Sequence, residues 1–271
     1  MHEILRNLTA GARVLDLGSR SGSFAADGYP EIRIVRLDLE LPERGSRDSF
    51  VQADAARLPF PDRSFDAIVA SHSLEHMVEL DKVLREVGRV VRRDGSLFVA
   101  VPDASTFTDH VYRWIYHGGG HVNAFRSADA LAAQISQATG LGLVATRILH
   151  SSFQFLDNRI FRPRPPRRLW LLGNGNPKFI AALSYAVRAL DRLLRTRTSI
   201  YGWAFYFGNI REEIETAPWT NVCAGCGTAQ SAAALTANHL VRRSGILRTY
   251  ICPYCGAWNL FTSDVTPNTV I

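Results

Sequence analysis

The chain has 271 residues, a length that fits one large domain or a domain with a small added module. Apolar residues make up 46% and charged residues 21% of it, which is typical of a folded globular protein and excludes a collagen, a coiled coil or a disordered chain. It lacks an apolar run of the roughly 18–20 residues that a membrane span requires, and its first residues lack the apolar stretch of a signal peptide. We therefore expect a cytoplasmic protein.

The positive charge of the chain is concentrated in one segment. The formal net charge is +6, but residues 159–197 alone contain ten basic residues against the single acid Asp191. The high isoelectric point therefore describes this segment and says little about the rest of the surface.

Short apolar segments alternate with segments of helical periodicity from Ala12 onward, which is the pattern of βαβ units and a mostly parallel sheet. The predicted strands cover residues 13–17, 32–39, 49–52, 64–71, 96–101, 141–149 and 200–207. Apolar residues spaced by about 3.6 positions predict a helix over 74–91. Two more helices are predicted near 105–117 and 127–138, the second with Ser127 as its N-cap.

A turn that contains two glycines follows the first predicted strand, with the sequence D-L-G-S-R-S-G over residues 16–22. Glycines at a strand-to-helix turn let the backbone approach a ligand and present amide N–H groups at a helix N-terminus. Asp38 ends the second strand, 22 residues after Asp16, where a carboxylate can accept hydrogen bonds from ribose hydroxyls. Taken alone, the turn also fits a tight bend without a ligand.

Further segments in the same half of the chain point to one family. They are F-V-Q-A-D-A-A-R-L-P-F-P-D-R-S-F-D-A-I-V-A (50–70), S-H-S-L-E-H-M (71–77) and L-R-E-V-G-R-V-V-R-R-D-G-S-L-F-V-A-V-P (84–102). In this order and spacing they resemble the class I S-adenosylmethionine-dependent methyltransferases, in the branch with an L-P-F-P-D-x-S-F-D signature, over about residues 12–150. The resemblance implies a Rossmann-like α/β fold, with a seven-stranded, mostly parallel sheet between flanking helices and an antiparallel last strand.

The resemblance also implies a site for S-adenosylmethionine at the ends of the first four strands. The residues that would line its methionine end are Asp16, Gly18, Ser19 and Gly22. Those that would hold the adenosine are Asp38 at the ribose, Leu39 against the adenine, and Asp54 and Ala55 at the adenine edge. Ser71 and His72 would border the transferred methyl group.

Arg20 departs from the family pattern, because glycine usually stands at its position. An arginine in a backbone conformation with positive φ costs about 1 kcal/mol or more. Arg20 is therefore expected to affect the affinity for the cofactor, but not the fold.

Two histidines are candidates for taking a proton from the methyl acceptor. His72 begins the stretch H-S-L-E-H (72–76), which formally matches a metalloprotease motif, but its place after a cofactor-site strand favours the methyltransferase interpretation. His121 begins H-V-N-A-F (121–125), which resembles a stretch that reaches the active site in this family. The alternatives are a helix-capping or solvated His72 and a His121 hydrogen-bonded to the backbone.

An insertion of about fifty residues separates the sixth and seventh strands. Its prolines exclude a regular helix over residues 161–170, whereas Asn176 and Pro177 supply an N-cap and first turn for a helix that follows. That helix has one apolar side and a second side with Arg188, Arg192 and Arg195. It fits a packed helix with a solvated basic face, a lid over the acceptor, or a contact with an anionic partner or membrane surface.

All four cysteines lie near the C-terminus, in the pairs C-A-G-C-G (223–227) and C-P-Y-C-G (252–256), which are separated by 25 residues. Each pair is typical of a zinc knuckle, a tight turn that directs two thiolates at one ion. Together Cys223, Cys226, Cys252 and Cys255 predict a structural Zn²⁺ site in a module that resembles a zinc ribbon. The alternative is a pair of dithiols or disulfides.

The sequence thus predicts a methyltransferase domain over about 1–212, with a basic helical insertion at about 153–198, and a zinc ribbon-like module over 218–264. We expect S-adenosylmethionine-dependent O-methylation of a small molecule, a sugar or a lipid-linked glycan. The alternatives are an RNA or protein methyltransferase that binds through the insertion and the ribbon, and a non-catalytic zinc-binding scaffold with a decayed fold. Peripheral contact with a membrane or another anionic surface through residues 159–197 is compatible with the first interpretation, and nucleic acid is a less favoured partner.

Overall fold

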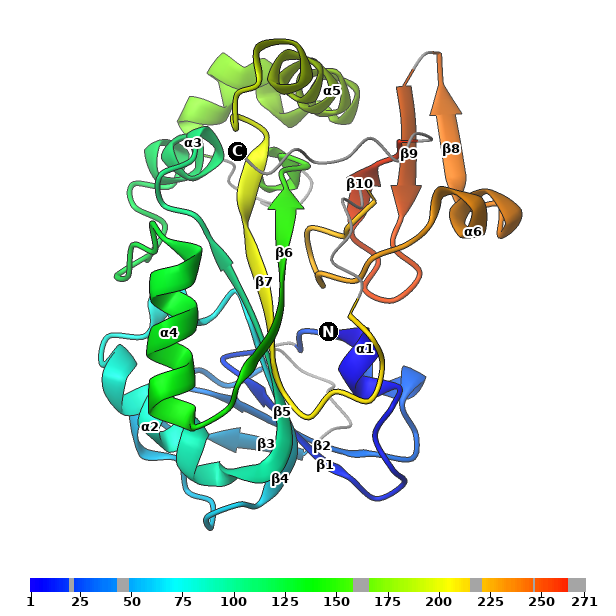
Figure 1. Cartoon of the computed structure of the whole chain (residues 1–271). Coiled ribbons are helices and arrows are strands. Elements are labelled where there is room, and N and C mark those ends of the chain that lie inside the picture. Colours follow the sequence, from blue (N-terminus) through cyan, green and yellow to red (C-terminus); the bar gives the residue numbers. More distant parts are fainter. Residues whose placement is uncertain (20–21, 43–48, 158–165, 215–220, 246, 263–271) are drawn as a thin grey trace.

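The computed structural model describes residues 1–19, 22–42, 49–157, 166–214, 221–245 and 247–262. Its centre is a seven-stranded sheet in the order β3-β2-β1-β4-β5-β7-β6 (Figure 1). The strands are β1 (Arg13–Leu17), β2 (Arg33–Asp38), β3 (Ser49–Gln52), β4 (Phe65–Ser71), β5 (Val91–Pro102), β6 (Leu143–His150) and β7 (Ile200–Gly208). Strands β1 to β5 pair in parallel, and β7 lies antiparallel between β5 and β6. This arrangement confirms the predicted fold class.

Helices α2 (Leu80–Val90) and α4 (Ala128–Thr139) cover one face of the sheet (Figure 1). Leu84 and Val87 of α2 and Ile135 of α4 are buried in one apolar cluster with residues of β1, β4, β5 and β7. The hydroxyl of Ser127 accepts a hydrogen bond from the amide of Ala130 at 3.2 Å, so the predicted N-cap of α4 is confirmed.

The helix predicted over residues 74–91 is interrupted. A short 3₁₀ helix, η3 (Leu74–His76), is followed by an extended residue at Met77, and α2 begins at Leu80. The Asn123 side chain explains the break, because its amide nitrogen donates to the carbonyl oxygens of Leu74 and Met77 at 2.8 and 2.7 Å. Side-chain hydrogen bonds of this kind compete with the backbone bonds of a continuous helix and favour the turn that is observed.

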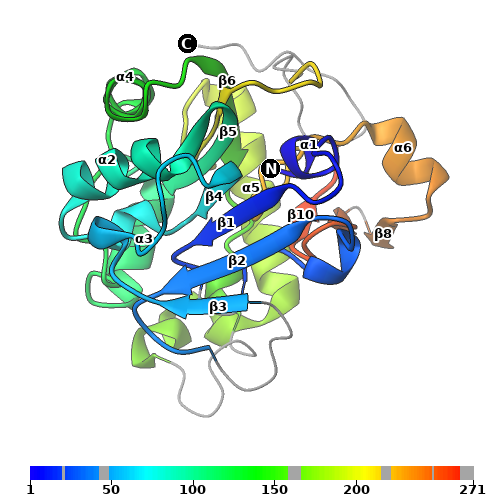
Figure 2. The same cartoon turned by 90° about the horizontal axis from the view of Figure 1, so that it is seen from below.

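The opposite face of the sheet has a different cover. In the described part of the segment between β1 and β2 the only helical turn is the 3₁₀ helix η1 (Ala26–Gly28), so the glycine turn is not followed by the α-helix that its pattern suggested. Helix α1 (His2–Leu5) and the C-terminal module lie on this face instead (Figures 1 and 2). Cys223 and Cys226 of the module are buried in the same apolar cluster as Val69 of β4 and Phe98 of β5.

The C-terminal module contains α6 (Ala232–Ala237) and a three-stranded antiparallel sheet in the order β10-β9-β8. Its strands are β8 (Val241–Ser244), β9 (Leu247–Ile251) and β10 (Trp258–Leu260). Trp258 pairs with Ile251, and the cysteine pairs lie in the loops before α6 and between β9 and β10.

Helices α3 (Phe107–Ile115) and α5 (Pro177–Leu194) lie at the end of the sheet where β6 ends (Figure 1). The Asn176 side chain caps α5 by accepting from the amide of Lys178 at 2.9 Å, as predicted. A 3₁₀ segment, η6 (Arg167–Gly175), precedes it, and a smaller one, η4 (Gln154–Leu156), follows β6. Arg159, Arg162 and Arg164 lie outside the described residues.

One residue of α5 departs from the predicted basic face. Arg188 is half-buried, and burial lowers its pKa to about 10, although the nearby Asp191 opposes this effect. Arg192 and Arg195 remain exposed. Within the described residues, none of the helices combines the length and the apolar composition needed to span a membrane.

Candidate functional site

A cavity of about 860 Å³ opens where the first four parallel strands end. Gly18 follows β1, Asp38 ends β2, Asp54 follows β3 and His72 follows β4, and all four residues line the cavity. Ligands of open α/β sheets bind at this edge, in the crevice beyond the carboxyl ends of the strands. The volume lies within the range of small-molecule sites, about 300–1,000 Å³.

Gly18 shows why the turn after β1 requires glycine. Its φ is +67°, and an added Cβ would lie 2.7 Å from Cβ of Ser73, closer than two carbon atoms can pack. Its amide donates to the carbonyl of Leu37 at 2.7 Å, which fixes the turn against the end of β2. The wall of the cavity therefore consists of bare backbone at this point.

The predicted adenosine-binding residues lie together. Asp38, Leu39, Asp54 and Ala55 all line the cavity. One oxygen of Asp38 accepts from the amide of Glu40 at 3.1 Å, and one oxygen of Asp54 accepts from the amide of Ala56 at 2.9 Å. These bonds orient each carboxylate at a strand end, where it can accept further hydrogen bonds from a ligand.

The residues predicted for the methionine end divide into two groups. Gly18 lines the cavity, whereas Asp16, Ser19 and Gly22 are not among its lining residues. Asp16 is fully buried and accepts from the amide of Ser23 at 2.8 Å. Burial raises its pKa, while the hydrogen bonds from Ser23 oppose the rise.

Ser19 and Gly22 form part of the same turn. The hydroxyl of Ser19 donates to the carbonyl of Asp16 at 3.2 Å, and the amide of Gly22 donates to the carbonyl of Ser19 at 2.6 Å. The φ of Gly22 is +102°, a conformation that L side chains rarely adopt, so the turn again needs glycine at this position. Arg20 lies outside the described residues.

His72 lines the cavity in a fixed tautomer. Its Nε2 lies 3.3 Å from the carbonyl oxygen of Ala224, which can only accept, so Nε2 carries the hydrogen. The Tyr201 hydroxyl lies 3.4 Å from Nδ1 and donates to it. Burial lowers the pKa of His72 to about 4, so the ring is neutral at pH 7. The φ of His72 is +54°, a strained conformation of the kind found at functional sites.

A second polar cluster lies next to His72. Glu75, His76 and His121 each direct one ligand atom to within 4.8 Å of the others, an arrangement that could hold a divalent cation. Nδ1 of His76 lies 3.1 Å from the carbonyl oxygen of Gly120, and Nδ1 of His121 lies 3.3 Å from Oδ1 of Asp109. His76 and Gly120 line the cavity, whereas His121 lies one layer behind, with its ring centroid 4.9 Å from that of His76.

The cluster contains two carboxyl groups in different states. Burial, with a smaller contribution from the nearby Asp109, raises the pKa of Glu75 to about 8. Burial also acts to raise the pKa of Asp109, but the close contact with His121 and the hydrogen bond from Arg113 outweigh it and lower the pKa below its usual value. At pH 7 Glu75 is therefore neutral and Asp109 is charged.

Several residues that line the cavity were not predicted from the sequence. Ser73, Met77 and Gly120 line the cavity although their types carry no specific signal. The loop that contains Gly120 reaches the cavity because the amides of Val122 and Asn123 donate to the backbone carbonyl of Glu75 at 2.8 and 3.0 Å. The run of three glycines before His121 was the available sequence signal for a loop with close contacts.

The four cysteines form a compact cluster in the C-terminal module. The Sγ atoms of Cys223 and Cys255 lie 3.5 Å apart, and those of Cys226 and Cys252 lie 3.7 Å apart. A disulfide requires about 2.05 Å, whereas thiolates at about 2.3 Å from a tetrahedral zinc ion lie roughly 3.8 Å from each other. The spacing therefore fits the predicted metal better than disulfides.

We expect purified protein to contain one zinc ion per chain and Cys226→Ser to lose it, because the small module has little other core with which to fold. Metal analysis and limited proteolysis of residues 221–262 test this, with the exposed Thr236→Ala as a matched control. A zinc-free wild-type protein whose module resists the protease would contradict the prediction.

The chain is similar in sequence to known methyltransferases. Residues 15–99 match the family described as "Methyltransferase domain". A demethylmenaquinone methyltransferase from Thermotoga maritima is 34% identical over 125 residues, which are 40% of this chain and 55% of that protein. A malonyl-[acyl-carrier protein] O-methyltransferase from Geobacter sulfurreducens is 27% identical over 71% of this chain and 78% of its own length.

A solved structure of a SAM-dependent methyltransferase from Archaeoglobus fulgidus is 16% identical, with a TM-score of 0.49 over 73% of this chain and 86% of its own. The chain spans only about half the length of the first relatives it matches, at 55% and 43%.

Proposed function

We propose that this chain is a class I S-adenosylmethionine-dependent methyltransferase that methylates a small hydroxylated acceptor, a proposal supported by the match of residues 15–99 to the family described as "Methyltransferase domain". The observation that carries the proposal is the cavity at the strand ends, where Gly18, Asp38, Asp54 and His72 meet. Backbone at Gly18 would accommodate the methionine end of the cofactor, and the carboxylates would hold its adenosine. The bound cofactor supplies an activated methyl group, so the protein mainly has to position the acceptor and exclude water.

The polar cluster supports a hydroxyl as the acceptor. Asp109 is a charged carboxylate 3.3 Å from Nδ1 of His121, which favours the tautomer whose Nε2 can accept a proton. His72 and His76 line the cavity between this pair and the cofactor residues. We assign His121 as the proton acceptor, which an acceptor hydroxyl beside His76 would reach directly or through one bridging water, and His72 as the group that borders the methyl.

The surface of the insertion supports a lipid-linked acceptor, whereas the relatives support only the broader class of small-molecule acceptors. Trp170, Leu171 and Leu193 are 70%, 74% and 78% exposed, on elements that also carry Arg167 and Arg192. Exposed apolar side chains among basic ones suit a lipid surface with anionic head groups. The two relatives are named for demethylmenaquinone and for malonyl bound to a carrier protein. A sugar or a lipid-linked glycan is the acceptor that we propose.

The proposal is tested by offering labelled S-adenosylmethionine with total RNA, total protein and a glycan and lipid extract side by side. We expect label in the extract. Label in RNA or protein, and none in the extract, would refute the acceptor class and favour a macromolecular substrate. A well-folded protein that fails to bind the cofactor at millimolar concentration would refute the enzyme itself.

The cofactor site makes a separate prediction. Asp38→Ala should weaken the binding of S-adenosylmethionine by about 1.5–3 kcal/mol, roughly 10–150-fold in Kd, because a charged acceptor for the ribose hydroxyls is lost. Calorimetric titration measures it, with the exposed Asp129→Ala as a matched control and NAD as a competing ligand. If Asp38→Ala and wild type bound S-adenosylmethionine with equal affinity, Asp38 would not be the residue that holds the ribose.

A further inference from the structure

The first cysteine pair touches the candidate methyl-transfer site directly. Ala224 and Gly225, which lie between Cys223 and Cys226, face the end of β4 with their carbonyl oxygens. The hydroxyl of Ser71 donates to the carbonyl of Gly225 at 3.4 Å, and Nε2 of His72 donates to that of Ala224 at 3.3 Å. These are the two residues that the family resemblance places beside the transferred methyl group.

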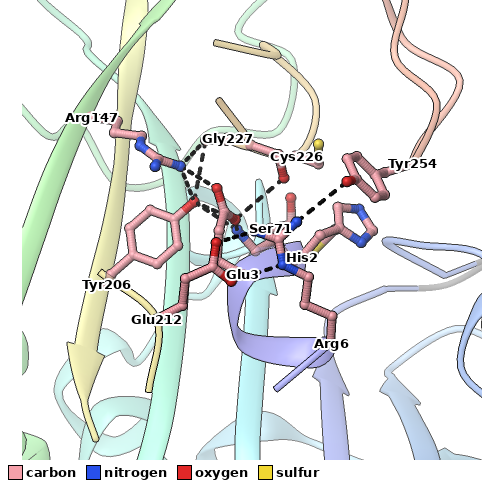
Figure 3. Close-up of polar contacts among 12 residues, drawn as sticks. His2, Glu3, Arg6, Ser71, Arg147, Tyr206, Glu212, Cys226, Gly227 and Tyr254 are labelled. Carbon is pink, nitrogen blue, oxygen red and sulfur yellow. Dashed lines mark hydrogen bonds and ion pairs between the residues drawn. The ribbon is translucent and has the colours of Figure 1, made fainter. Parts of the chain in front are cut away.

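The same turn is anchored to the sheet on its other side (Figure 3). The carbonyl of Gly227 accepts from Nη1 of Arg147 at 3.1 Å and from the hydroxyl of Tyr206 at 3.2 Å, and Arg147 also pairs with the buried carboxylate of Glu3. An added Cβ at Gly227 would lie 2.8 Å from Cβ of Ala204. The knuckle is thus packed against β7 without space to shift.

Asn259 of β10 links the two halves of the module at this knuckle. It is 4% exposed, and its Oδ1 accepts from the amide of Ala224 at 3.0 Å. Its Nδ2 lies 3.4 Å from Sγ of Cys223 and donates to the carbonyl of Ala257 at 2.9 Å. Asn259 therefore orients both a metal-ligating thiol and the peptide that contacts His72, without being a ligand itself.

His72 needs such support because its backbone is strained. A residue other than glycine with a φ of +54° stays in that conformation only when its neighbours hold it there. Three contacts hold His72: its amide donates to the carbonyl of Ala100 at 2.8 Å, Tyr201 donates to Nδ1, and Nε2 donates to the knuckle.

We propose that the metal-binding knuckle at residues 223–227 is a wall of the methyl-transfer site, and that Asn259 is a positioning residue that holds Ser71 and His72 through it. The module then completes the site on the sheet face where, in the described residues, only the 3₁₀ helix η1 and no α-helix lies between β1 and β2. The role of the knuckle in methyl transfer rests on the proposed function, whereas its contact with Ser71 and His72 is independent of it.

Asn259→Ala tests the proposal, with the exposed Asn238→Ala in the same module as the matched control. In samples shown to contain one zinc per chain, we expect hydrogen exchange of residues 69–73 to become roughly three- to tenfold faster in Asn259→Ala, as the loss of weak hydrogen bonds implies. Exchange in α4 should be unchanged. In nuclear magnetic resonance, the Nε2–H signal of His72 should shift or be lost by exchange with solvent, which a merely structural loss elsewhere would not cause.

Unchanged exchange at 69–73 in zinc-loaded Asn259→Ala, or an equal change in Asn238→Ala, would overturn the proposal. Should Asn259→Ala fail to fold, the wild type provides the second test: a chelator should remove the protection of residues 69–73 and added zinc should restore it. Protection that survives zinc removal would also overturn the proposal. Titration with S-adenosylmethionine distinguishes failure of the proposed function from failure of the proposed wall. A wild-type protein that does not bind the cofactor refutes the proposed function, whereas the exchange experiment still tests the contact between the knuckle and residues 69–73.

Discussion

His121→Gln is expected to lower the rate of methyl transfer by about 10²–10⁴-fold, the usual contribution of a positioned general base. The affinity for S-adenosylmethionine should change less than about threefold in Kd, because His121 does not line the cavity that contains Asp38 and Asp54. Asp109→Asn should produce part of the same loss, since an amide at this position no longer favours the tautomer with a free Nε2.

The measurement is the rate of label transfer from saturating cofactor to the glycan and lipid extract. His110→Gln is the matched control, because His110 is an exposed histidine on the same helix as Asp109, and its Nδ1 lies 2.6 Å from the carbonyl of Thr106. An undiminished rate in His121→Gln would remove His121 from the reaction. The base would then be sought at His76 or His72, which line the cavity.

Much of the fold could be predicted because buried parallel strands leave a local signal. Apolar runs placed β1 at Arg13–Leu17 and β3 at Ser49–Gln52, with the bounds that the structure shows. The carboxyl ends of parallel strands meet at one edge, so Asp38, Asp54 and His72 could be expected near one another although they are distant in sequence.

The differences come from contacts that local patterns do not encode. The 3.6-residue periodicity continued from Leu74, but Asn123 occupies the carbonyls of Leu74 and Met77 and ends the first turn. Nothing in the cysteine spacing showed that the knuckle would pack on Ser71 and His72. The short segment between the first two strands was the one available sign that a separate element covers this face of the sheet.

The second large effect that we expect is a dependence of stability on pH, caused by Glu75. Its side chain is buried, and among the described residues Oε2 has no hydrogen-bond partner. A carboxylate in such a place is costly, and burial accordingly raises the pKa of Glu75 to about 8. In the unfolded chain the pKa returns to about 4.3.

The sign of the effect follows from proton binding. Between these two pKa values the folded protein holds a proton on Glu75 that the unfolded chain has released, so stability falls as pH rises. The contribution is complete below about pH 4.3 and is lost by about pH 8, at roughly 1.4 kcal/mol per pH unit. The total loss from this group is on the order of 5 kcal/mol, most of it between pH 5 and pH 8.

Glu75→Gln removes this dependence, because the amide keeps the shape and neutrality of the protonated acid. We expect the free energy of unfolding of Glu75→Gln, relative to wild type, to rise by roughly 4 kcal/mol between pH 5 and pH 8. Urea unfolding of both proteins across this range measures the difference, in which the titration of the other groups, common to both proteins, largely cancels. Glu79→Gln, a change of the same kind at an exposed position, should show no such trend. Parallel pH profiles for wild type and Glu75→Gln would mean that Glu75 is ionised in the folded protein. A metal ion held by Glu75, His76 and His121 would then account for its charge.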